Sequence, residues 1–101
     1  MYQDKLQSDQ IRATSALLKF CREHQRSGEW IQLIENCLHS LERGNNKEAV
    51  SYFDKVPFGG MGCFNDWFPS KVFPNETDEY AWTVFEALAA YWYSRMKLLS
   101  K

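Results

Sequence analysis

The sequence predicts an all-α fold, a small antiparallel bundle of four to five helices with one structured loop rich in aromatic residues and glycine. Three observations support this. The chain has 101 residues, the size of a single domain, so residues 1–101 are expected to form one unit. Several segments carry apolar residues at helical spacing. Aromatic residues make up 16% of the chain, enough for a core that needs neither a metal nor a disulfide.

Four segments have helical periodicity, and we expect helices at 5–25, 29–43, 47–54 and 77–99. The second is the clearest, because its apolar residues form one stripe: Trp30, Ile31, Ile34, Cys37, Leu38 and Leu41. Gly44 suits the left-handed cap that follows it, and Asn45 or Asn46 can cap the third helix. Asn75 or Thr77 can cap the last helix.

The segment 57–75 contains all three prolines, and it also contains four phenylalanines and Trp67. Solvated linkers are rich in glycine, serine and charge rather than in aromatic residues. We therefore expect a structured loop held by its own aromatic side chains. A short helical turn around 64–68 would be the fifth helix.

Charge is unevenly distributed along the chain, although the net charge is only −1. Residues 27–94 hold ten acidic and four basic residues. An acidic central region disfavours nucleic acid as a partner and favours a basic protein.

Three cysteines without CxxC spacing are not typical of a disulfide framework, and the N-terminal segment is too polar for a signal peptide. The chain has no run of 18 apolar residues, so no membrane-spanning helix is expected. These features predict a cytoplasmic protein with reduced thiols.

No motif in the sequence predicts catalysis, a cofactor or a metal. The glycines at 59, 60 and 62 lack the spacing of phosphate-binding loops, and they are better explained by a tight turn. Cys63 has no base near it in the sequence, and His24 and His39 do not have metal-ligand spacing. We therefore expect a protein that is not an enzyme.

Asn65 and Asp66 can be interpreted in two ways. Both residue types favour turns, so local side-chain hydrogen bonds that shape the loop are the favoured interpretation. Alternatively, Asp66 displays a charge to a partner. Trp67 presents the same choice, between core packing and an interface contact.

The string GGMGCFNDW at residues 59–67 resembles a GGMGS-x-ND segment of a family of small bacterial immunity-like proteins. The resemblance covers roughly residues 30–95. Cys63 replaces the usual serine, which puts one loop hydrogen bond in doubt, and a Trp-Phe-Pro run replaces aliphatic residues. Within this family, the chain looks most like an immunity protein of contact-dependent growth inhibition systems. The resemblance implies a cytosolic antidote that binds the C-terminal toxin domain of a secreted effector, with nucleases such as RNases as candidate toxins.

The leading hypothesis is thus stoichiometric blockade of a basic toxin domain by exposed acidic and aromatic residues. The contact residues that we predict are Asp66, Trp67, Glu76, Asp78 and Glu79. A helical adaptor that binds a peptide or a subunit is the alternative, and it would expose an apolar groove instead. A small enzyme acting through Cys63 or a histidine is the third hypothesis.

Overall fold

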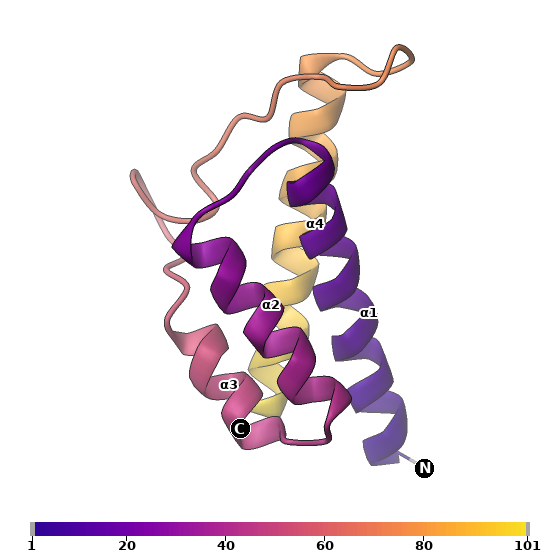
Figure 1. Ribbon diagram of the computed structural model, residues 1–101, viewed down its shortest axis with the longest axis vertical. Helices are drawn as coiled ribbons and strands as arrows, with labels where there is room; N and C mark the ends of the chain where they lie inside the picture. The colour runs from indigo at the N-terminus through magenta and orange to yellow at the C-terminus, as the bar shows by residue number, and fades with distance from the viewer. Residues whose placement is uncertain (1, 101) are drawn as a thin grey trace.

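The computed structural model describes residues 2–100 and the side chains of residues 7–100. The described residues form four helices and no strand: α1 (Tyr2–Glu23), α2 (Glu29–Glu42), α3 (Asn46–Asp54) and α4 (Asp78–Leu99). Figure 1 shows the long helices α1 and α4 next to each other, with α2 and α3 packed against them. The prediction of an all-α bundle with one long irregular segment is confirmed.

Local capping residues end and start the helices as expected. Gly44 has a positive φ of 78°, and its amide and that of Asn45 donate to the carbonyls of Leu41 and Ser40. This pattern is the Schellman motif, in which a left-handed residue closes the helix end. Asn45, rather than Asn46, then caps α3 by accepting from the amide of Glu48. At the start of α4, the cap is Thr77 rather than Asn75.

The helix α1 begins at Tyr2, earlier than expected, and it ends with the same motif built on a residue other than glycine. Gln25 has φ 64°, and its amide and that of Arg26 donate to the carbonyls of Arg22 and Cys21. A non-glycine residue in this region costs about 1–2 kcal/mol. The reversal turns Arg26 back toward the core.

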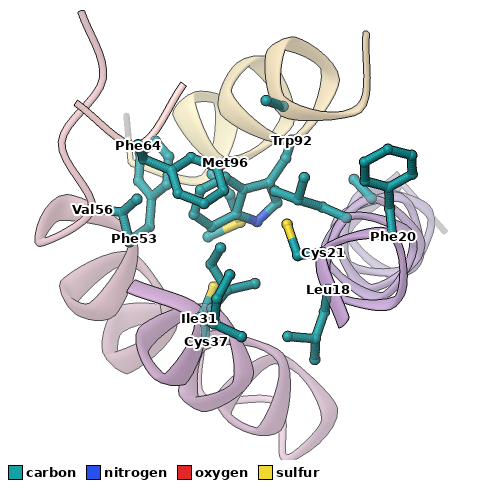
Figure 2. Packing of buried hydrophobic residues seen from close by; sticks show 14 of the residues in the cluster. Leu18, Phe20, Cys21, Ile31, Cys37, Phe53, Val56, Phe64, Trp92 and Met96 are labelled. Carbon is teal, nitrogen blue, oxygen red and sulfur yellow. The ribbon is translucent and has the colours of Figure 1, made fainter. Parts of the chain in front are cut away.

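The core of the bundle is aromatic at its centre. Trp92 of α4 is fully buried, and its indole nitrogen donates to the hydroxyl of Thr14 in α1. Phe53 of α3 packs edge-on against Trp92, and Phe64 lies in the same cluster (Figure 2). Because Phe64 belongs to the segment between α3 and α4, this segment is part of the hydrophobic core.

The segment between Asp54 and Asp78 is irregular, and the helical turn around 64–68 does not form. Side chains from 67 to 69 alternate instead: Trp67 is half-buried, Phe68 is exposed and Pro69 is buried. This alternation is typical of extended backbone that packs one side against a core. The described residues therefore form four helices and not five. The loop crosses the upper part of α4 (Figure 1).

Candidate functional site

The glycine-rich turn at 59–62 is held by the two polar residues that follow it. The side-chain amide of Asn65 donates to the carbonyl of Gly59, and its oxygen accepts from the amide of the same residue, at 3.1 and 3.0 Å. Asp66 accepts from the amide of Gly62 at 2.9 Å. Both residues thus form the local hydrogen bonds of the favoured interpretation, and Asp66 stays exposed. The turn presents Met61, whose exposed fraction is 95%.

Trp67 mainly anchors the loop. Its ring meets those of Phe20 and Phe85 edge-on, with centroids 6.3 and 4.8 Å apart. The guanidinium carbon of Arg26 lies 4.7 Å from its centroid and 4.4 Å from that of Phe64. Arg26 also donates to the carbonyl of Phe64 at 2.9 Å. Partial burial of this guanidinium lowers the pKa of Arg26 from its ordinary value.

Glu76 holds the second half of the loop, around residues 72 and 73, through hydrogen bonds. One carboxylate oxygen accepts from the amides of Val72 and Phe73, at 2.7 and 3.2 Å. The same oxygen lies 2.9 Å from Nε2 of His24, at the end of α1. These hydrogen bonds, with that of the Val72 amide foremost, lower the pKa of Glu76. The Glu76 side chain is only 9% exposed, so little of it is accessible to a partner.

The other two predicted acidic residues differ from each other. Asp78 accepts from the amide of Lys71 at 2.6 Å, which ties the loop to the first turn of α4. Glu79 is exposed, and its carboxylate has no hydrogen-bond or ion-pair partner among the residues that the structure describes. Glu79 lies in the first turn of α4, where its negative charge interacts favourably with the helix dipole.

Beside Glu79 lies a hollow of about 220 Å³ that sequence reasoning missed. The rings of Phe68 and Trp82 pack on each other, with centroids 5.2 Å apart, and together form its aromatic wall. Phe68 is 69% exposed, although large apolar side chains usually pack inward. The spacing of three residues between Glu79 and Trp82 was the available signal, because such residues are neighbours on a helix surface.

A second hollow, of about 270 Å³, lies further along α4 between that helix and the loop. It is lined by Phe58 and Asn65 of the loop and by Glu86, Ala89, Ala90 and Tyr93 of α4. Glu79, Trp82, Glu86 and Tyr93 are separated by three, four and seven residues, so they share one stripe of the helix. We call Phe58, Phe68 and these four residues the acidic–aromatic face.

None of the histidines and cysteines lines either of the two hollows. Burial raises the pKa of Cys21 and Cys37 to about 12, so both thiols stay protonated at neutral pH. Cys63 is half-buried in the glycine-rich turn, and His39 is exposed on α2.

The part of the chain that the structure describes contains neither a candidate metal site nor a membrane-spanning helix. No group of three or more His, Cys, Asp or Glu side chains in that part of the chain could hold a metal ion. In the same part, no helix is long and apolar enough to cross a membrane.

Comparison with known proteins gives a family without an assigned activity. No curated protein matches the chain, and no solved structure does. The profile of a domain of unknown function (DUF6966) matches residues 23–73, from the end of α1 through α2, α3 and most of the loop. This stretch is half of the chain and contains the glycine-rich turn with the two residues that hold it, and the chain therefore belongs to the DUF6966 family.

Proposed function

We propose that this chain is an immunity protein, which binds a basic toxin domain one-to-one and blocks it without any catalysis of its own. The observation that carries the proposal is the acidic–aromatic face. There, Glu79 and Glu86 are exposed carboxylates without intramolecular partners among the described residues, and exposed aromatic rings lie beside them. Aromatic residues are enriched among the side chains that contribute most to binding at protein interfaces, and a polar rim surrounds them.

The charge around the part of the face from Phe68 to Glu86 supports a basic partner, whereas at its other end Lys97 Nζ lies 5.5 Å from the centroid of the Tyr93 ring. Residues 66–86 contain five acidic residues and only one basic residue, Lys71. Nucleases hold phosphates in basic active sites, so a protein that blocks such a site gains from an acidic surface. The resemblance of residues 59–67 to bacterial immunity-like proteins points to the same class of partner. A nuclease, such as an RNase, is therefore the candidate toxin.

We also propose that the protein acts in the cytoplasm. All three cysteines are free thiols, which fits a reducing compartment. A toxin delivered into the cell would be met there by an antidote already present. The required affinity is high, and complexes of this kind bury on the order of 1,600 Å² in total.

The test is co-expression with the toxin. The domain encoded directly upstream would be expressed alone and together with this chain, and cell survival and co-purification would be measured. We expect a lethal domain that becomes harmless and co-purifies one-to-one with this chain. A harmless domain, or a lethal one that this chain neither binds nor neutralises, would refute the proposal.

A charge reversal then tests the face itself. Glu86→Lys should lower protection, because it places a positive charge in the middle of the surface that meets the basic partner. Glu42→Lys is the matched control, since Glu42 is also an exposed helical glutamate but lies on α2. Equal protection by both variants would show that another surface binds the toxin.

The alternative function is a helical adaptor, and one observation favours it. The second hollow has an apolar lining from Phe58, Ala89 and Tyr93, which would suit an apolar side chain of a peptide. Salt separates the two functions, because screening weakens binding through carboxylates and leaves apolar binding largely unchanged. We favour the immunity function because a carboxylate, that of Glu86, lines the second hollow.

A further inference from the structure

We propose that the hollow lined by Phe68 and Trp82 is a socket for a single arginine side chain of the partner. This inference rests on the proposed function in one respect only, namely that the partner is a basic protein. It goes further by naming the chemical group that enters and the residues that hold it. The guanidinium would stack on the aromatic wall and donate hydrogen bonds to the carboxylate of Glu79 at the rim.

The aromatic wall of the socket is already in place without a partner. Phe68 and Trp82 are inclined by 35° to each other, and Phe68 keeps most of its surface exposed. The neighbouring Pro69 is buried, and the hydrogen bond from the Lys71 amide to Asp78 fixes the next residues to α4. A wall held in this way loses little conformational entropy on binding.

The rim of the socket carries negative charge at the first turn of α4, where only the helix dipole, and no basic side chain of the described residues, offsets it. The Glu79 carboxylate has no ion pair within the described part of the chain, and Asp78 uses only one of its oxygens, on a backbone amide. A positive group in the hollow would therefore face two carboxylates and an aromatic surface together. This combination attracts cations by cation–π and charge-assisted hydrogen bonds.

The same combination of an arginine, aromatic rings and an oxygen acceptor occurs elsewhere in this protein. Arg26 stacks over the rings of Phe64 and Trp67 at 4.4 and 4.7 Å, and it donates to a carbonyl oxygen at the edge of the stack. The socket offers the same two elements, an aromatic wall and an oxygen acceptor, but lacks the cation. We assign arginine rather than lysine, because a planar guanidinium stacks on rings and bonds a carboxylate through two parallel donors.

The experiment uses the full chain and a small probe. N-acetyl-arginine amide would be titrated into the ¹⁵N-labelled protein, and the indole signal of Trp82 and the backbone amides of 68–71 and 78–79 would be followed. We expect saturable shifts confined to these groups, with half-saturation on the order of 10 mM. N-acetyl-citrulline amide, which is the uncharged analogue, should produce none, and N-acetyl-lysine amide should bind at least about threefold more weakly.

Two variants of exposed residues test the walls of the socket without disturbing the core. Phe68→Ser and Glu79→Gln should each weaken the arginine probe about threefold to tenfold. Glu42→Gln on α2 is the control and should leave binding unchanged. Shifts that do not saturate, that appear equally with citrulline, or that persist in both variants would overturn the socket.

The outcome is independent of whether a toxin exists. If the probe does not bind but the chain still neutralises the upstream domain, the socket is wrong and the immunity function stands. If the probe binds and no toxin is found, the socket stands for another basic partner, and the immunity function is wrong.

Discussion

Phe64→Ala is the substitution that most directly tests whether the irregular loop belongs to the core. Phe64 is fully buried, and its ring meets those of Phe58, Phe85 and Trp92, with centroids 5.6, 5.6 and 6.3 Å away. Truncating such a side chain loses its transfer free energy and leaves a cavity, at a cost of about 3–5 kcal/mol. The guanidinium of Arg26 also loses the ring on which it stacks.

That cost is a large part of the stability of a domain this size, which is typically about 5–15 kcal/mol. For a domain of about 100 residues, it corresponds to a fall in Tm of about 15–30 °C. Phe68→Ala is the matched control, because it removes the same side chain four residues along the same loop. Since Phe68 is 69% exposed, we expect a loss within about 0.5 kcal/mol.

The assay is urea unfolding followed by circular dichroism at 222 nm for the wild type and both variants. The midpoint should fall steeply for Phe64→Ala and stay nearly constant for Phe68→Ala, with similar m-values in all three. A Phe64→Ala variant within about 1 kcal/mol of the wild type would refute the placement of the loop in the core. Equal losses in both variants would refute it as well.

Three further predictions concern the loop and the thiols. Glu76→Gln should make the free energy of unfolding less dependent on pH in the acid range. Because the pKa of Glu76 in the folded protein lies below the ordinary 4.5, its carboxylate stabilises the protein above that value, and this contribution is lost as the pH falls through the lowered pKa. Urea midpoints between pH 3 and 7 would measure the difference. Asn65→Ala should cost about 1–3 kcal/mol in thermal unfolding, because it removes two hydrogen bonds from the glycine-rich turn. In the native protein a thiol reagent should label Cys63 first, and the two buried cysteines should react only on unfolding; simultaneous labelling of all three would contradict their burial.

The helices could be predicted because their signals are local. The apolar stripe of α2 recurs within each turn, so Ile34, Cys37 and Leu41 could be placed inward from spacing alone, and the structure buries all three. Gly44 ends that helix for a reason contained in four or five neighbouring residues. The start of α1 was placed too late, because helix ends depend on weaker signals than helix interiors.

The state of the acidic residues could not be predicted, because it depends on contacts between distant segments. Glu76 and Glu79 are three residues apart and look alike in the sequence. Glu76 is nevertheless held by His24, which is 52 residues away, whereas Glu79 has no partner among the described residues. The exposure of Trp82 could not be predicted from the sequence either. The helix α4 is apolar around much of its circumference, so periodicity alone does not identify the side chains that remain outside the core.

The acidic residues around the loop can be separated into those that hold the fold and those that the fold does not need. Asp66, Glu76 and Asp78 accept hydrogen bonds from backbone amides, whereas Glu86 is exposed in the middle of α4 without a partner in the described part of the chain. Removing an unpaired surface charge changes stability by less than about 0.5 kcal/mol. If the carboxylate serves a basic partner, Glu86→Gln should therefore leave the urea midpoint unchanged while it speeds dissociation of the complex or slows its formation at low salt. Loss of stability in this variant, with unchanged binding kinetics, would show that Glu86 supports the helix and not the interface.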